Sequence, residues 1–180
     1  PCFFYFVESF LIVDLKEIVN DYELNFCGKR CKVETNFKHL PEFMILFDIR
    51  DLYHLLGIHK LKTKYRATNW VEAVKADVFL LSNYSKHPNF REVLPRVDNY
   101  NFLYEIFYQF RVNVCILDKD LTKNTMKLSV VFYKDNKKKL VVVGLKRDET
   151  GVFRPATLHE SRNNPYKRIR HTAIKSITWI

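Results

Sequence analysis

Two histidines and a lysine that lie close together in the sequence could carry acid–base chemistry. The segment from Asp51 to Lys60 reads DLYHLLGIHK, with His54 before Gly57 and His59 after it. An imidazole titrates near neutral pH and can accept or donate a proton, while a neighbouring lysine can stabilise negative charge. The alternative is that His54 lies at the edge of the core and that the apolar residues of this segment simply pack.

The two rings can meet only if the helix between them ends. Residues five apart on a continuous helix point about 140° apart. If Asp51 caps a short helix and Gly57 ends it in the left-handed conformation, His59 and Lys60 can return toward His54. The C-terminus of such a helix favours a protonated imidazole at His54.

A second group of candidate residues lies near the C-terminus. Residues two apart on a strand share a face, so Thr157 and His159 are expected to point the same way. The residues around them are basic or aromatic, and they are Arg154, Arg162, Tyr166, Lys167, Arg168 and Arg170. Guanidinium groups suit phosphate oxygens, and a threonine hydroxyl can donate to the same group. The combination predicts a phosphate-binding cluster, although each basic residue taken singly fits a solvated surface.

These residue types suit the cleavage of RNA without a metal ion. The reaction needs a base for the 2′-hydroxyl, an acid for the leaving 5′-oxygen and cations at the phosphorane. His54 would be the base or the acid, and either His59 or His159 would be its partner.

Cations and an aromatic ring complete this hypothesis. Lys60, Arg162 and Lys167 would stabilise the charged transition state. Tyr166 would stack on a base or donate to the phosphate.

Other enzyme classes fit the sequence less well. It contains no glycine-rich phosphate loop, G-x-S-x-G elbow or H-E-x-x-H pair, and no evident paired acids for a two-metal nuclease. Cys27 and Cys31 lack a second pair that would complete a zinc site. We therefore expect neither a metal nor a cofactor.

The formal net charge of +10 belongs to the last third of the chain. Residues 1–118 carry 15 Lys+Arg and 15 Asp+Glu, whereas residues 119–180 carry 15 and 5. A basic face attracts polyanions through counterion release, which favours RNA, single-stranded or in a tRNA loop, as the partner. The alternative is a solvated basic surface, which suits Lys137, Lys138 and Lys139 in a predicted hairpin loop.

Length and composition predict one domain over residues 1–180, with 47% hydrophobic residues and only 4 Gly. The fold class is α+β, with a central antiparallel sheet in the C-terminal part packed by N-terminal and middle helices. No signal peptide is visible, and the apolar run over residues 3–13 is too short and too charged to span a bilayer. A cytoplasmic protein with reduced thiols and no membrane partner is expected.

Periodicity divides the chain into three parts: a helix and hairpin over 1–60, a helical cover over 69–110 and a basic antiparallel sheet over 112–180. Helical spacing covers residues 3–23, 70–81 and 100–110, and Pro88 and Pro95 are expected to break regular structure between the last two. Strands are predicted over residues 25–35, 42–49, 112–117, 126–133, 140–146, 152–159 and 174–180.

The order of these pieces, together with the segment from Tyr53 to Lys60, resembles the phage-associated nucleases of the barnase, EndoU, colicin and RelE superfamily. The resemblance implies an α+β fold with a central antiparallel sheet and metal-independent RNA cleavage. Such proteins act in phage defence, lysogeny or toxin systems, where an antitoxin or immunity protein would be a second partner.

The resemblance also implies roles for particular residues. The motif histidine of the family matches His54, and the trailing lysine matches Lys60. Thr157, followed by Tyr166 and Lys167, is similar to the family's strand hydroxyl with its basic loop.

Two other functions remain open at this point. The basic third alone would suffice for a nucleic-acid-binding module without catalysis. A protein-interaction domain, such as a phage-encoded inhibitor or immunity factor, would use the aromatic-rich helices as its contact surface.

Overall fold

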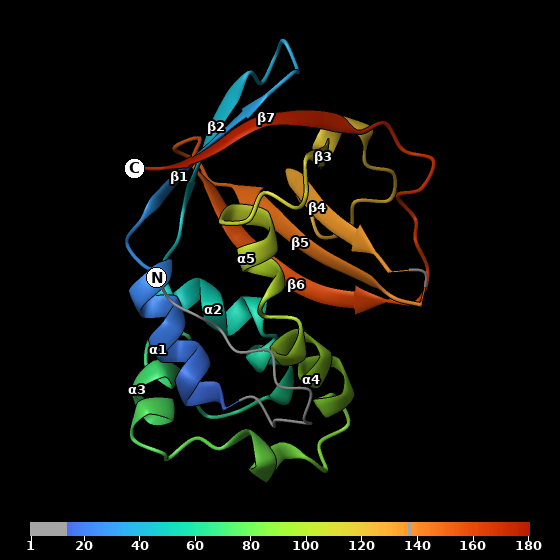
Figure 1. The fold of residues 1–180 in the computed structure, drawn as a ribbon. Helices are drawn as coiled ribbons and strands as arrows, with labels where there is room; N and C mark the ends of the chain where they lie inside the picture. Colours follow the sequence, from blue (N-terminus) through green and yellow to red (C-terminus); the bar gives the residue numbers. More distant parts are fainter. Residues whose placement is uncertain (1–13, 137) are drawn as a thin grey trace.

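The computed structural model describes residues 14–136 and 138–180 (Figure 1). The first described helix is capped by Asp14, whose side chain accepts a hydrogen bond from the backbone N–H of Lys16 at 2.9 Å. This aspartate is a typical N-cap. Of the helix predicted over residues 3–23, the part before residue 14 lies outside the described residues.

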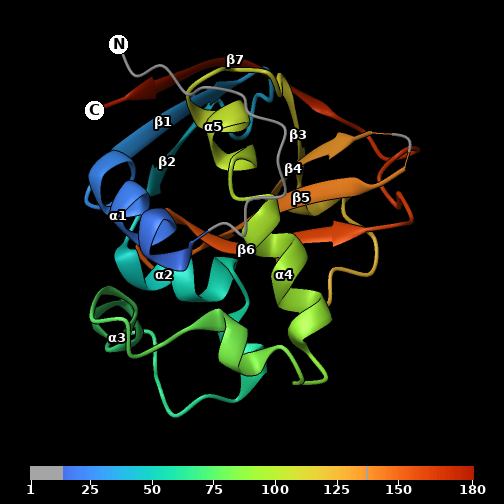
Figure 2. The same cartoon turned by 60° about the horizontal axis from the view of Figure 1, so that its bottom comes forward.

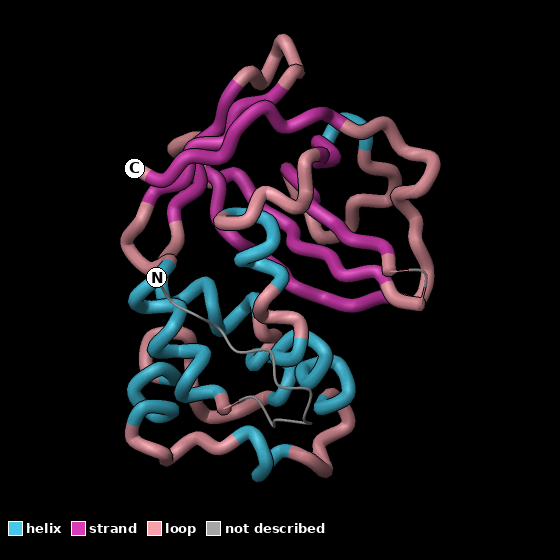
Figure 3. Tube along the Cα trace, in the orientation of Figure 1, coloured by secondary structure: helices cyan, strands magenta, loops and turns pink. Residues whose placement is uncertain are grey.

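Within the described residues, the α-helices end by Phe107, and most strands follow that residue. Figure 3 shows most of the helices gathered below the strands. The α-helices are α1 Leu15–Asn25, α2 Ile49–Leu55, α3 Trp70–Lys75, α4 Phe90–Asp98 and α5 Phe102–Phe107. Short 3-10 helices are η1 Ile58–Leu61, η2 Leu81–Tyr84 and η3 Asp118–Asp120. The strands are β1 Arg30–Thr35, β2 Glu42–Leu46, β3 Val114–Leu117, β4 Val130–Asp135, β5 Leu140–Arg147, β6 Phe153–Ser161 and β7 Thr172–Trp179.

The strands form one mixed sheet that closes on itself in the order β1-β2-β6-β5-β4-β3-β7. Its pairs are antiparallel except for β2 and β6, which meet in parallel at Ile45 and Phe153. The predicted α+β fold class, with the sheet in the C-terminal part, is confirmed. The predicted hairpin also forms, because β1 pairs with β2, and it joins the sheet through β7.

Most helices gather on one side of the sheet. Figure 1 shows α1, α2, α3 and α4 below the strands, and in Figure 2 the strand β6 again lies next to α2 and α4. Aromatic rings fill the junction between helices and sheet: the Phe47 ring lies 5.4 Å from Phe26, 5.2 Å from Phe107 and 5.4 Å from Trp179. Such burial of aromatic area dominates the stability of a core.

The strands β4, β5 and β6 bury side chains on both faces. The inner face contributes Val143 and Leu158 to the main core. The outer face contributes Val142 to a smaller apolar cluster, against which Tyr133 and Tyr166 pack. This outer face of the sheet borders the candidate site described below.

Two predictions about the helices are wrong. The helix predicted over 70–81 ends at Lys75, and the chain turns at Asp77, whose φ is +57°. The region expected to be broken by prolines contains helix α4, with Pro95 inside it. Burial of Val93 and Val97 on one stripe of this helix outweighs the backbone hydrogen bond that the proline removes.

Among residues 14–136 and 138–180, no helix combines the length and the apolar character that crossing a membrane requires.

Candidate active site

A cavity of about 620 Å³, here called the histidine cleft, lies where α2, η1 and α4 meet β6. Its lining is rich in histidine, lysine and arginine and consists of His54, His59, Lys60, Arg96, Met126, Lys146, Arg154, Pro155, Ala156 and Thr157. No described carboxylate lines it. A cleft lined by one sign of charge concentrates ligands of the opposite sign.

The N-cap of helix α2 is Asp48, three residues before Asp51, which was predicted as its cap. The Asp48 side chain accepts from the backbone N–H of Arg50 at 2.9 Å, and the Asp51 side chain accepts from the backbone N–H of Asp48 at 3.0 Å. Asp51 is therefore the returning member of a capping box, because it lies at the third helical position. Burial raises the pKa of its carboxyl to about 6.

The helix ends as predicted, at a glycine. Gly57 has φ of +70°, and the chain then turns into η1, which carries His59 and Lys60. The ring centroids of His54 and His59 lie 5.3 Å apart. Two imidazoles thus meet at one wall of the histidine cleft.

Both imidazoles have a lowered pKa. Burial is the main cause for each ring, followed by Lys146 for His54 and by His54 itself for His59. The helix end was expected to favour the protonated form of His54, whereas burial and the nearby Lys146 lower the pKa of this ring. Neutral imidazoles can accept a proton at pH 7.

The buried guanidinium of Arg96 forms the floor of the cleft. Its Nε donates to the carbonyl of Glu92 at 3.1 Å, and its Nη1 donates to Thr157 Oγ1 at 3.2 Å and to the carbonyl of Leu55 at 3.4 Å. The side chain is only 8% exposed, and burial lowers its pKa. Within the described parts of the chain, no carboxylate forms an ion pair with it. A buried cation bonded only to neutral oxygens keeps its charge available for an anion.

Gly57 is also required to make room for this arginine. A Cβ atom added at Gly57 would lie 2.8 Å from Arg96 Cδ and 2.9 Å from Nε. Only glycine combines this close approach with a positive φ. The same residue therefore turns the chain between the histidines and seats the guanidinium beside them.

A β-bulge gathers the residues that β6 contributes. Gly144 of β5 pairs with Thr157 and Leu145 pairs with Pro155, so Ala156 is the extra residue. The bulge moves Arg154 to the same outer face as Thr157, where simple alternation would place it on the opposite face. The next pair along β5 brings Lys146 beside Arg154. Both cations line the histidine cleft.

His159 lies on the same outer face but lines a neighbouring cavity of about 380 Å³, which shares Arg96 and Met126 with the histidine cleft. Burial, reinforced by Arg96 and Lys60, lowers the pKa of His159 to about 4. Lys60 is held by Glu92, whose Oε2 lies 2.5 Å from Nζ. His54 and His159 thus line two different cavities, and Arg96 borders both.

The remaining predicted phosphate ligands lie beyond the far end of β6. They belong to the connection from β6 to β7 and are Arg162, Tyr166, Lys167, Arg168 and Arg170. Ser161 ends β6 four residues after Thr157, which corresponds to about 13 Å along a strand. Figure 1 shows this connection at the right of the sheet, away from the helices. None of the five lines the histidine cleft.

The sequence did not point to Arg96 or Lys146. An arginine beside a proline resembles any surface position of an irregular segment, and only the fold shows that this one is buried. The two strong signals at this site were the pair of histidines and the glycine between them.

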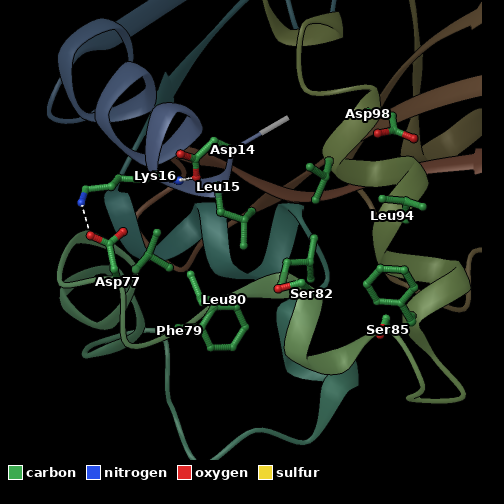
Figure 4. A pocket seen from close by; sticks show the side chains of 14 residues that line it. Asp14, Leu15, Lys16, Asp77, Phe79, Leu80, Ser82, Ser85, Leu94 and Asp98 are labelled. Carbon is green, nitrogen blue, oxygen red and sulfur yellow. Dashed lines mark hydrogen bonds and ion pairs between the residues drawn. The ribbon is translucent and has the colours of Figure 1, made fainter. Parts of the chain in front are cut away.

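A different cavity, of about 610 Å³, lies between α1, the segment after α3, and α4 (Figure 4). Its walls are mostly apolar, and Asp14, Asp77 and Asp98 stand at its edge. It contains no histidine or arginine. No group of three or more metal-ligating side chains is found in residues 14–136 and 138–180.

Comparison with known proteins identifies the family. No curated protein and no solved structure matches the chain. Residues 14–180 match the family described as phage-Barnase-EndoU-ColicinE5/D-RelE like nuclease4, which confirms the resemblance inferred from the sequence. The matched region includes every residue of the histidine cleft, and the chain belongs to this family of nucleases.

Proposed function

We propose that this nuclease is a metal-independent endoribonuclease that cleaves RNA by attack of the 2′-hydroxyl on the adjacent phosphorus. The observation that carries this proposal is the placement of two imidazoles, 5.3 Å apart, beside the unpaired guanidinium of Arg96. The family supplies the substrate class, because a nuclease acts on nucleic acid.

His54 and His59 transfer the protons. One neutral imidazole takes the proton of the 2′-hydroxyl, the oxygen bonds to phosphorus, and the bond to the 5′-oxygen breaks as that oxygen receives a proton from the other, protonated imidazole. A bound phosphate anion favours this second, charged ring. The products are a 2′,3′-cyclic phosphate and a 5′-hydroxyl. His159 is the alternative partner of His54, reaching the phosphate from the adjoining cavity.

The cations of the cleft stabilise the phosphorane. Arg96, Lys146 and Arg154 present positive charge from three different elements, so they can surround a phosphate. Arg154, whose Nε donates to Asp148 Oδ2 at 3.2 Å, would exchange this partner for the substrate. The Thr157 hydroxyl accepts from Arg96 and can itself donate to a phosphate oxygen. Lys60 would exchange its partner Glu92 for the substrate.

The substrate is single-stranded RNA or a tRNA loop, because in-line attack by a 2′-hydroxyl needs a nucleotide free of helical stacking. Cys27, Cys31 and Cys115 are free thiols, which fits the proposed cytoplasmic location. In a toxin system, an antitoxin or immunity protein would hold the enzyme inactive.

The test uses a single-stranded RNA and its 2′-deoxy analogue in excess chelator. We expect cleavage of the RNA alone, 2′,3′-cyclic phosphate ends, and loss of at least about a hundredfold in rate for His54→Ala and His59→Ala. His39→Ala is the matched control, because this ring packs on Phe37 in the β1–β2 turn. Cleavage of the deoxy analogue, or full activity of His54→Ala, would overturn the proposal.

The His159→Ala variant decides between the two partners of His54. If His59 is the partner, His159→Ala retains most of the activity while His59→Ala loses it. The opposite result would assign the second proton transfer to His159. Retention of RNA without any cleavage would instead favour a binding module.

A further inference from the structure

We infer that the connection from β6 to β7 forms a second RNA subsite, which holds nucleotides flanking the scissile phosphate. This inference rests on the proposed function of the histidine cleft. It assigns a role to the basic residues that the fold keeps away from that cleft.

A row of paired residues joins the histidine cleft to the β6–β7 connection. His159 of β6 pairs with Val142 of β5, and Val142 pairs with Tyr133 of β4. Paired residues share a face, and neighbouring strands are about 4.8 Å apart, so Tyr133 lies about 10 Å from His159 on the same outer face. An RNA strand leaving the cleft over His159 would next meet Tyr133.

A group of three rings lies at the end of this row. The Tyr133 ring lies 5.4 Å from Tyr166 and 5.5 Å from His171, and the Tyr133 hydroxyl is 2.6 Å from His171 Nε2. Each of the three rings is partly exposed. Aromatic platforms of this kind bind unpaired bases, since every base offers a π-face.

The end of the chain that follows β6 carries only positive charge. Residues 161–180 contain Arg162, Lys167, Arg168, Arg170 and Lys175 but no acidic residue. The first four are exposed, and none of them forms an ion pair within the described residues. Exposed cations beside stacking rings match a backbone lined with phosphates, whereas an acidic protein would offer no bases for the rings. The chemistry therefore favours single-stranded RNA over a protein partner.

The test compares a dinucleotide, which reaches only the histidine cleft, with a longer single-stranded RNA. For the triple variant Lys167→Glu, Arg168→Glu, Arg170→Glu we expect the ratio of kcat/KM for the longer RNA to kcat/KM for the dinucleotide to fall at least about tenfold. Tyr166→Leu keeps an apolar side chain but removes the ring, and it should lower the same ratio about tenfold.

The matched control changes the same net charge elsewhere. Lys29, Arg30 and Lys38 also lack ion pairs in the described chain. They lie just before, in and just after β1, which is at the opposite side of the sheet in Figure 1. Replacing these three residues by glutamate should leave the ratio of the two kcat/KM values within about twofold of that of the wild type. The change reduces only the overall electrostatic attraction between the protein and RNA. Equal falls in both triple variants would overturn the subsite.

Binding of the 2′-deoxy analogue, followed by fluorescence anisotropy over a range of salt, separates this inference from the proposed function. The subsite predicts that the slope of log K against log salt becomes shallower by about 2 in the first triple variant, and less in the control. An unchanged slope would overturn the subsite even if the wild-type protein cleaves the dinucleotide. A protein that cleaves neither RNA would contradict the proposed function, and the slope would still decide the subsite.

Discussion

Replacing Gly57 by alanine should damage the active site through the position of Arg96. The added Cβ would lie 2.8 Å from Arg96 Cδ, and reaching an ordinary contact of 3.4 Å requires a shift of about 0.6 Å. The bond from Arg96 Nη1 to Thr157 Oγ1 is already 3.2 Å long, so a shift of this size can break it. The guanidinium would then lose its place at the floor of the cleft.

Gly28→Ala is the matched control, because Gly28 has φ of +73° and a Cβ there would meet nothing within 4 Å. Both variants share the cost of a left-handed non-glycine residue, about 1–2 kcal/mol. Gly57→Ala adds overpacking of about 1–3 kcal/mol. Its melting temperature should therefore fall about twice as far as that of Gly28→Ala, at about 2–4 °C per kcal/mol.

The rate of RNA cleavage should distinguish Gly57→Ala from Gly28→Ala more clearly than the melting temperature does. Gly57→Ala should cleave RNA at least about tenfold more slowly than Gly28→Ala, since removing one donor to a transition-state oxyanion costs about a hundredfold or more. In an Arg96→Met background the two alanine variants should differ little in rate, because the group that transmits the effect is absent. Equal rates and equal melting temperatures of the two single variants would refute the reasoning.

Three further changes test the electrostatics of the site. Arg96→Lys should lower the rate of RNA cleavage about a hundredfold while the fold is retained. The reason is that one ammonium cannot bond both Thr157 and a phosphate in the geometry of the guanidinium fork. A cleavage rate near that of the wild type would contradict this role of Arg96. Lys146→Met removes a cation that lowers the pKa of His54, so the acid limb of the kcat/KM profile should move to higher pH, and an unmoved limb would exclude His54 as the base. Burial lowers the pKa of His159 to about 4, so the unfolded chain binds a proton before the folded chain does as the pH falls. Stability should drop by about 2 kcal/mol from pH 7 to about pH 5, and urea titrations of His159→Gln should show less of this loss.

Local patterns were sufficient to predict most of the elements. Alternation located the strands from β3 to β7, and the short turn between two apolar runs located the β1–β2 hairpin. Helix α4 was missed because Pro95 breaks a helix in isolation, whereas the burial of Val93 and Val97 is a tertiary effect. Closure of the sheet through β7 and β1 joins distant residues, and no local pattern predicts it.

In the candidate site too, some features follow from local sequence and others depend on residues that are distant in the chain. The approach of His54 and His59 followed from their spacing around a glycine, which is a property of ten consecutive residues. The position of Arg96 depends on packing between α4, Gly57 and β6. A single sequence contains no signal that distinguishes this arginine from exposed ones, because its burial is decided by elements far away in the chain.

The bulge at Ala156 divides β6 into two segments, and the alternation of inward and outward side chains in one segment is shifted by one residue relative to the other. Arg154 before it and Thr157 after it share a face although they are three residues apart, so a search for alternating side chains would separate them. Deletion of Ala156 would place Arg154 two residues before Thr157, so a regular ladder would keep both side chains on the outer face. The outer face therefore keeps both side chains in either of two ways, with two intervening residues and a bulge or with one intervening residue and a regular ladder. Relatives of the chain that lack a residue at this point should also lack the bulge.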